Sequence, residues 1–238
     1  GSEMCIRDRT GHITFEETVA LAEKWFSPIP RRHVPRRSLP MEPMQTEERR
    51  LTVERNVPVD ALYMAFHMCS RNHPDYYAFD MLSDLLSSGR SSRFVQHLVQ
   101  DKQIFNSIDA YISGSIDNGL FHIVGKPAPE KTLEEAEKAI WEELALLTEG
   151  SIDENELEKV KNRYESEQIF NNLNYLNVAT NLAYFELIGK AEDINTEVEK
   201  YRSVTQEQIK RAAKQTFLPE NCSVLYYKAA AKGASHTP

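Results

Sequence analysis

The chain of 238 residues is long enough for one large domain or two small ones, and its 41% hydrophobic and 27% charged residues predict a packed core. A formal net charge of −8 argues against general nucleic-acid binding, which requires a basic surface. No apolar run approaches the roughly 20 residues of a membrane-spanning helix, and three scattered cysteines are too few for a disulfide framework.

The first 46 residues divide into three parts. Residues 1–9 match no element and are interpreted as a tag or a sequence scar. Within 10–27, Thr14 and Glu17 form a capping-box pattern that opens a short helix. Residues 28–46 hold five prolines and four arginines, which predicts an exposed linker. The arginine cluster is a candidate site for an anionic partner, but a solvated surface is the favoured interpretation.

Residues 47–228 are expected to form the main domain, and 229–238 a loose tail. Alternating apolar residues predict five strands: Arg50–Asn56, Ala61–Met68, Phe105–Ser113, Leu120–Val124 and Cys222–Lys228. Two helices are expected between the second and third strands, and three between the fourth and fifth, with a break around Asn171–Asn174. The expected helix caps are Ser92, Thr132, Ser151 and Thr205. This order indicates an α+β fold with a mostly antiparallel sheet and helices packed on one face.

The segment Tyr76–Gly114 predicts two helices, joined by a Ser-Ser-Gly-Arg-Ser turn, that lead into a strand. It closely resembles the second half of pitrilysin/insulinase-type zinc metallopeptidases, similar to processing-peptidase-like bacterial members. Three further stretches fit this family. The end of its first half resembles GHITFEETVALAEKWFSPIP, the start of its second half resembles ERRLTVERNVPVDALYMAF, and a later helix resembles IDENELEKVKNRYESE. The resemblance covers nearly all of residues 11–228.

The resemblance implies that 10–27 is the remnant of a preceding catalytic-type half and that 47–228 is a complete second half of the metallohydrolase type. In the family, the first half binds the catalytic zinc through an H-x-x-E-H motif, which is absent here. The chain alone is therefore expected to be inactive and to hold no cofactor, whereas zinc is expected in the intact parent protein. The second half encloses a chamber and holds an extended peptide, for which strand addition to a sheet edge is one route.

In many members the second half also supplies an arginine and a tyrosine, seven residues apart, that stabilise the oxyanion. The resemblance places these positions at or next to Val99 and at Asn106. Val99 and Gln100 cannot supply the positive charge, and Asn106 donates only weakly. The resemblance therefore suits a non-catalytic half, in which Asn106 is a candidate for contact with the substrate.

The turn at Ser88–Arg93 is a second candidate site. One candidate role is anion binding at the N-terminus of the helix that follows, with Arg90 and Arg93 helping to bind the anion. The favoured interpretation is structural, with Gly89 in a tight turn and a serine capping the helix. The resemblance implies that Arg90, Ser92 and Arg93 organise a loop at the surface between the halves, where contact with substrate is secondary.

His67, Cys69 and His73 are weak candidates for a metal site, because all three are zinc ligands by type. Strand alternation places His67 and Cys69 on one face, with His73 in the loop that follows. Their spacing matches no standard site and no fourth ligand is identified, so a structural role is favoured.

The sequence is compatible with three functions, in order of preference. The first is the non-catalytic C-terminal half of a zinc metalloendopeptidase, which encloses the chamber and helps to hold a peptide for hydrolysis by the missing N-terminal half. The alternative is a non-proteolytic scaffold or assembly subunit of the same fold, and a stand-alone peptide-binding module ranks third. The expected partners are the catalytic half, on the same chain or a separate one, and a peptide substrate. Neither a nucleic-acid partner nor a membrane span is expected. A homodimer is a further option for the assembly. The expected compartment is the periplasm or the cytoplasm of a bacterium.

Overall fold

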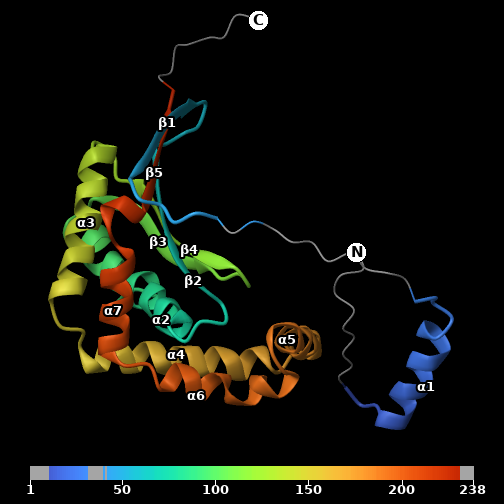
Figure 1. Ribbon diagram of the computed structural model, residues 1–238. Helices are drawn as coiled ribbons and strands as arrows, with labels where there is room; N and C mark the ends of the chain where they lie inside the picture. The colour runs from blue at the N-terminus through green and yellow to red at the C-terminus, as the bar shows by residue number, and fades with distance from the viewer. Residues whose placement is uncertain (1–10, 32–39, 41, 231–238) are drawn as a thin grey trace, which may run out of the picture. The chain divides into compact units, whose positions relative to one another are not determined.

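A computed structural model describes residues 11–31, 40 and 42–230 (Figure 1). The predicted scar, most of the arginine-rich part of the linker and most of the predicted tail lie outside the described residues. The predicted domain boundaries therefore stay predictions. No helix of the described ranges is both long enough and apolar enough to cross a membrane.

The chain forms two compact units, and each is described by itself. The sheet unit comprises Met44–Asn162 and Lys200–Pro238, and the smaller unit comprises Gly1–Pro43 and Arg163–Glu199, each as far as it is described. The chain passes from the sheet unit to the smaller unit within helix α4 (Glu154–Asn171) and returns within helix α6 (Glu197–Arg202).

The sheet unit contains one sheet of five strands in the order β1-β5-β2-β4-β3. The strands are β1 (Arg49–Arg55), β2 (Ala61–Ser70), β3 (Phe105–Ser113), β4 (Asn118–Pro127) and β5 (Cys222–Ala229). β1 and β5 are parallel, and the other three neighbouring pairs are antiparallel. The prediction of a mostly antiparallel sheet is thus confirmed.

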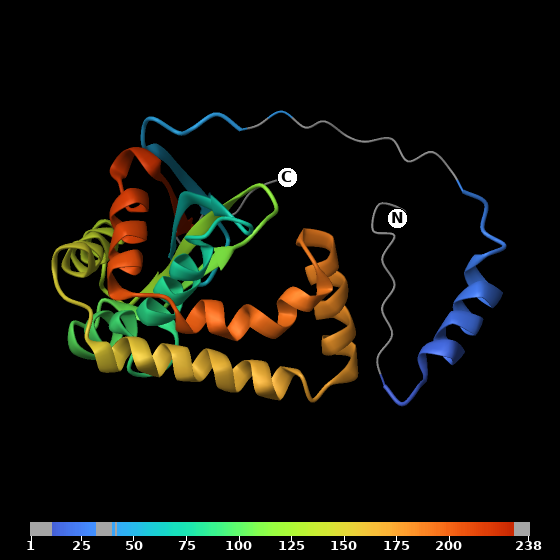
Figure 2. The same ribbon diagram turned by 60° about the horizontal axis from the view of Figure 1, so that its bottom comes forward.

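Three helices cover one side of this sheet: α2 (Tyr76–Ser87), α3 (Leu133–Glu149) and α7 (Gln206–Thr216). Figures 1 and 2 show all three gathered on the same side, which confirms the predicted arrangement. The unit also contains the π segment η1 (Phe94–Asp101), the 3-10 segment η3 (Pro219–Asn221), the start of α4 and the end of α6. η1 was expected to be an ordinary helix, but it is wound as a π-helix, in which each N–H bonds five residues back.

The smaller unit contains α1 (Phe15–Phe26), the end of α4, α5 (Tyr175–Ile188) and η2 (Ala191–Thr196). α1 buries none of its residues. The predicted break near Asn171 is confirmed, because α4 ends there and α5 begins four residues later. Asn174 caps α5, with its side-chain oxygen 2.8 Å from the backbone nitrogen of Leu176.

Capping boxes begin three helices as the sequence predicts. In each, a threonine hydroxyl accepts from a backbone N–H three residues on, and the glutamate or glutamine there accepts in return; the threonines are Thr14, Thr132 and Thr205. The predicted cap at Ser151 is wrong. α4 begins at Glu154, and Asp153 accepts from the backbone of Asn155 at 2.7 Å because it stands directly before the first turn.

The predicted cap at Ser92 is wrong as well. Its hydroxyl donates to the carbonyl of Gly89 at 2.7 Å, which closes the turn instead of the helix. Gly89 itself has a φ of 88°, a value that favours glycine, so the predicted tight turn is present.

The core of the sheet unit lies between the sheet and its helices. At its centre Phe66 is fully buried, and its ring meets Trp141 and Phe217 edge to face at centroid distances of 5.7 and 5.1 Å. Phe121 meets Phe217 in the same way at 5.1 Å. Such pairs add to the free energy gained by burying the rings.

A glycine in β4 makes room for another core ring. A Cβ at Gly125 would stand 2.4 Å from Cε1 of Phe105, whose side chain is buried. Gly125→Ala is therefore expected to lower the free energy of unfolding by about 1–3 kcal/mol, because the Phe105 ring must leave its position. Urea unfolding followed by the fluorescence of Trp141, in a Trp25→Phe background, would measure the loss.

A double-mutant cycle tests whether the Phe105 ring is the cause. Phe105→Leu removes the edge of the ring that the new methyl meets, so Gly125→Ala should cost less in that background than in the wild type. Equal costs in the two backgrounds would contradict the steric explanation.

Candidate functional site

The side of the sheet opposite α2, α3 and α7 is the candidate site and is called the open face. Its origin is the alternation of β2: Leu62 and Met64 are buried against the helices, whereas Tyr63 between them is 40% exposed. A single exposed apolar side chain is common, whereas a contiguous exposed apolar patch is a sign of a binding surface, so the neighbours of Tyr63 on this face matter.

The register of the strands brings distant segments together on the open face. Leu225 of β5 pairs with Leu51 of β1 on one side and with Tyr63 of β2 on the other. Val124 of β4 pairs with Tyr63 in turn. These residues form one apolar row across four strands, and Leu51 at its end is 60% exposed.

The next row along the strands is smaller and more polar. Ser223 pairs with Arg49 of β1 and with Ala65 of β2. Ala65 pairs with His122 of β4, which pairs with Tyr111 of β3. Two small side chains, those of Ser223 and Ala65, thus lie side by side in the middle of the sheet.

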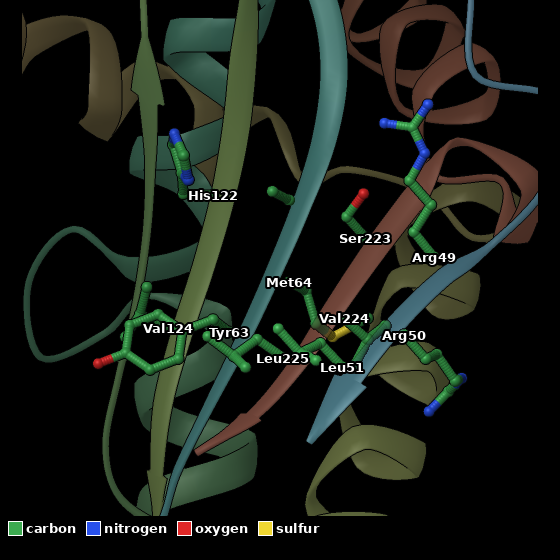
Figure 3. A pocket seen from close by; sticks show the side chains of 11 residues that line it. Arg49, Arg50, Leu51, Tyr63, Met64, His122, Val124, Ser223, Val224 and Leu225 are labelled. Carbon is green, nitrogen blue, oxygen red and sulfur yellow. The ribbon is translucent and has the colours of Figure 1, made fainter. Parts of the chain in front are cut away.

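A hollow of about 350 Å³ opens at this point (Figure 3). Its floor is formed by Ala65 and Ser223. The side chains around it are Arg49, Leu51, Tyr63, His122, Val124 and Leu225. The volume is at the lower end of the roughly 300–1,000 Å³ of ligand pockets, so the hollow is suited to a single side chain or a small group.

The floor of the hollow offers few polar atoms. The hydroxyl of Ser223 donates to Oε1 of Gln45 at 3.1 Å, and Nε2 of Gln45 donates to the carbonyl of Cys222 at 2.8 Å. Gln45 is buried, so it holds the Ser223 hydroxyl within the protein. The surface presented beside Ala65 is therefore mainly apolar.

Two arginines belong to the lining of the hollow, and among the described residues Arg50 alone has an ion-pair partner. Arg50 binds the carboxylates of Glu48 and Glu137 on the helix-covered side. Arg49 forms no ion pair with any residue that the structure describes. Its exposed guanidinium is thus the positive charge available at the rim of the hollow.

His122 forms the wall towards β3. Its ring stacks on Tyr111 at a centroid distance of 4.9 Å, and its Nε2 lies 2.9 Å from the hydroxyl of Ser113. Burial lowers the pKa of His122, so the imidazole is neutral at pH 7. Since no described carboxylate is bonded to this imidazole, the pair is not a hydrolytic triad.

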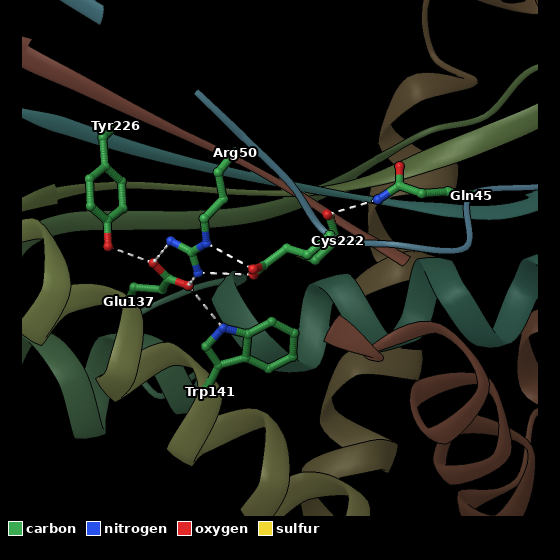
Figure 4. Close-up of polar contacts among 7 residues, drawn as sticks. Gln45, Arg50, Glu137, Trp141, Cys222 and Tyr226 are labelled. Carbon is green, nitrogen blue, oxygen red and sulfur yellow. Dashed lines mark hydrogen bonds and ion pairs between the residues drawn. The ribbon is translucent and has the colours of Figure 1, made fainter. Parts of the chain in front are cut away.

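A polar network behind the sheet fixes β1, the strand that carries Arg49 (Figure 4). Glu137 of α3 is 6% exposed and accepts hydrogen bonds from three side chains: Arg50 at 2.5 and 3.0 Å, Tyr226 at 2.6 Å and Trp141 at 3.3 Å. Burial by itself would raise the pKa of Glu137, but the bonds from Arg50 and Tyr226 outweigh it, and the pKa lies below its ordinary value.

The predicted loop residues lie elsewhere in the sheet unit. Arg93 donates from Nε and Nη2 to both carboxylate oxygens of Glu156 at 2.9 Å, and its side chain is 13% exposed. Ser92 is buried, whereas Arg90 is exposed. Arg93 thus ties the turn to α4. Contact of these residues with a ligand stays a prediction.

The positions implied for the oxyanion pair are also separate from the hollow. Asn106 is exposed on β3, and Val99 is half-buried in η1. The side chain of Gln100 donates to the carbonyl of Arg90 at 3.4 Å. Contact of Asn106 with substrate stays a prediction.

His67, Cys69 and His73 are not brought together as a metal site. Among the described residues, no three His, Cys, Asp or Glu side chains are placed to bind one metal ion. Burial, with a smaller effect of the Asp75 charge, raises the pKa of Cys69 to about 11, so its thiol is protonated at neutral pH. Nδ1 of His73 accepts from the backbone of Asp75 at 3.1 Å. The described residues do not fit a zinc ion.

The sequence patterns did not predict the hollow. It is built from four segments far apart in the chain, which contribute residues from 49–51, 63–65, 122–124 and 223–225. The alternation of β2 was a usable signal, because it assigns Tyr63 and Ala65 to the face opposite the core. It does not tell which residues of other strands lie beside them.

Comparison with known proteins places the chain in a family. Residues 10–164 match the family described as peptidase M16 inactive domain. The chain is 24% identical over 197 residues to the uncharacterized zinc protease YmxG of Bacillus subtilis (strain 168), covering 82% of this chain and 47% of that protein. It is 22% identical over 223 residues to the zinc protease PqqE of Helicobacter pylori (strain ATCC 700392 / 26695), covering 92% and 50%.

The chain therefore spans about half the length of these two relatives. The crystal structure of a protease from Helicobacter pylori has the same fold, with a TM-score of 0.82 and 21% identity over 91% of this chain and 53% of that chain. These findings confirm the resemblance to the second half of zinc metallopeptidases. Since the family match extends over more than half of its residues, the chain belongs to the peptidase M16 inactive domain family.

Proposed function

We propose that this chain is the non-catalytic half of a zinc metalloendopeptidase and that it helps to hold an extended peptide for cleavage by a catalytic half. The observation that carries the proposal is the open face, which leaves Leu51 and Tyr63 60% and 40% exposed above a hollow. Apolar surface in solvent is covered favourably by a ligand, at roughly 25 cal/mol for each Å² buried.

The edge of the sheet supports the same role. β1 pairs with β5, and within the described residues no strand pairs with its other edge. The backbone N–H and C=O groups along that edge suit an extended peptide that adds a strand. Such a peptide would lie next to Arg49 and Leu51, whose side chains border the hollow.

The role proposed for this chain is to position the peptide substrate. The H-x-x-E-H motif is absent from the sequence, so the proposal assigns cleavage, and the zinc that the family implies for it, to the catalytic half. Holding a peptide in one orientation accelerates its reaction because the entropy of alignment is lost before the chemical step.

Cleavage of a quenched fluorescent peptide mixture tests this proposal. The chain, the separately expressed upstream half of its parent gene and a mixture of the two are each assayed with added zinc. Activity in the mixture alone is expected. Chelator-sensitive activity of this chain by itself would overturn the non-catalytic assignment. Association of the halves without any cleavage would favour a non-proteolytic scaffold.

A further inference from the structure

We infer that the hollow is a side-chain subsite for one large apolar residue of a bound peptide, and that Arg49 selects peptides with an acidic residue close to it. This inference deepens the proposed function and rests on it. It names a class of peptide and two residues that determine the preference, Ala65 on the floor and Arg49 at the rim.

The shape and lining of the hollow favour an apolar occupant. Its floor, Ala65 and Ser223, lies beside the row of larger side chains formed by Leu51, Leu225 and Tyr63. The hydroxyl of Ser223 is already bonded to Gln45. A polar group placed here would lose its bonds to water and gain few in return, whereas an apolar side chain loses nothing.

The charge at the rim favours an acidic neighbour. Among the described residues no carboxylate lines the hollow, and Arg50 is occupied by Glu48 and Glu137. Arg49 forms no ion pair within the described part of the chain. A carboxylate of the peptide would supply the ion-pair partner that the described residues do not.

The spacing of the sheet fits both contacts in one peptide. Arg49 and Ser223 are register partners on neighbouring strands, which lie about 4.8 Å apart. In an extended peptide, residues two apart point to the same side and are separated by about 6.6–6.8 Å. An apolar side chain above Ser223 therefore leaves a residue two positions away within reach of the long Arg49 side chain.

The net charge of the chain favours basic peptides, which is the opposite of the preference inferred for Arg49. At −8, the protein as a whole repels acidic peptides and attracts basic ones. A preference for an acidic peptide would therefore have to come from a local cation.

The test uses four peptides of ten residues, acetylated and amidated, with Gly and Ser at every other position. They carry Phe and Asp two residues apart, Phe and Lys, Phe and Asn, or Ser and Asp. Each is titrated into the ¹⁵N-labelled full chain, and amide shifts give both the affinity and the place of binding. The Phe and Asp peptide is expected to bind most tightly and to shift the amides of Leu51, Tyr63 and Leu225.

Two variants separate the two contacts. Ala65→Leu fills the hollow and is expected to weaken the Phe and Asp peptide by at least tenfold. Arg49→Glu is expected to weaken it by about tenfold and to make the Phe and Lys peptide the tighter ligand. The controls are Ser107→Leu, at an exposed position of β3, and Arg55→Glu, the same charge change six residues along β1.

The outcomes are distinguishable. Weakening by Ala65→Leu and Arg49→Glu, with both controls binding as the wild type does, supports the inference. If the two variants bind the peptides with wild-type affinity, or if the affinity depends on the net charge of the peptide alone, the inference is overturned and the proposed function still stands. No binding of any peptide, together with no gain of cleavage when the halves are mixed, would overturn both.

Discussion

Replacing Arg50 with methionine is expected to lower the free energy of unfolding of the sheet unit by about 3 kcal/mol. Arg50 supplies two of the hydrogen bonds to the carboxylate of Glu137, whose side chain is 7% exposed. Without Arg50, the hydrogen bonds that the described residues still donate to this carboxylate come from Tyr226 and Trp141. A buried charge that loses its ionic partner costs roughly 3–5 kcal/mol, and the lower end applies because Arg50 itself is half exposed.

The loss should depend on pH. The folded pKa of Glu137 lies below its ordinary value of 4.5, so its stabilising contribution is present above pH 4.5 and disappears as the pH falls through the folded pKa. In Arg50→Met, the hydrogen bonds and charge of Arg50 no longer lower the pKa of Glu137, so the carboxyl takes up its proton at a higher pH than in the wild type. The difference in stability between variant and wild type should therefore be largest at neutral pH and should shrink as the pH falls through the pKa of the variant towards that of the wild type.

Urea unfolding at pH 7 and pH 4 would check both statements. In a Trp25→Phe background, Trp141 is the remaining tryptophan and reports on the sheet unit. Arg49→Met is the matched control, because Arg49 stands next to Arg50 on the same strand but forms no ion pair among the described residues, so its loss should cost little. Equal losses for the two variants, or a loss that does not change with pH, would contradict the role assigned to Glu137.

Phe66→Ala should produce a larger loss, about 3–5 kcal/mol, because it removes the ring at the centre of the core. Phe66 is fully buried and meets both Trp141 and Phe217 edge to face. The packed neighbours cannot collapse fully into the space left by the ring, so the cost of the cavity adds to that of lost burial.

Tyr63→Ala is the matched control for this prediction. It removes an aromatic ring from the same strand, three residues earlier, but on the open face where Tyr63 is 40% exposed. Its cost should stay below about 1 kcal/mol. Urea unfolding at pH 7 measures both variants, and comparable losses would mean that the two faces of β2 are wrongly assigned.

The fold was largely predictable because its signals are local. The threonines at 14, 132 and 205 each have an acceptor three residues on, and the structure contains each capping box. Two serine caps failed for a local reason. Asp153 stands closer to the start of α4 than Ser151 does, and the hydroxyl of Ser92 finds a carbonyl within its own turn.

The candidate site was not predictable in this way. β5 comes last in the sequence but lies between β1 and β2 in the sheet. The floor of the hollow therefore joins Ala65 to Ser223, which are 158 positions apart, and only the strand order brings them together. Arg93 is the opposite case. The sequence identified it as a candidate site residue, and in the structure its guanidinium donates hydrogen bonds to the carboxylate of Glu156.

Photo-crosslinking tests most directly whether the open face holds peptide. A peptide with an acidic residue two positions from a benzoylphenylalanine is irradiated with the full chain, and the adducts are mapped by mass spectrometry. Adducts on the segments 49–51, 63–65 and 223–225, reduced in Ala65→Leu, are the expected result. Adducts confined to α2, α3 and α7, on the other side of the sheet, would contradict the proposed role of the open face.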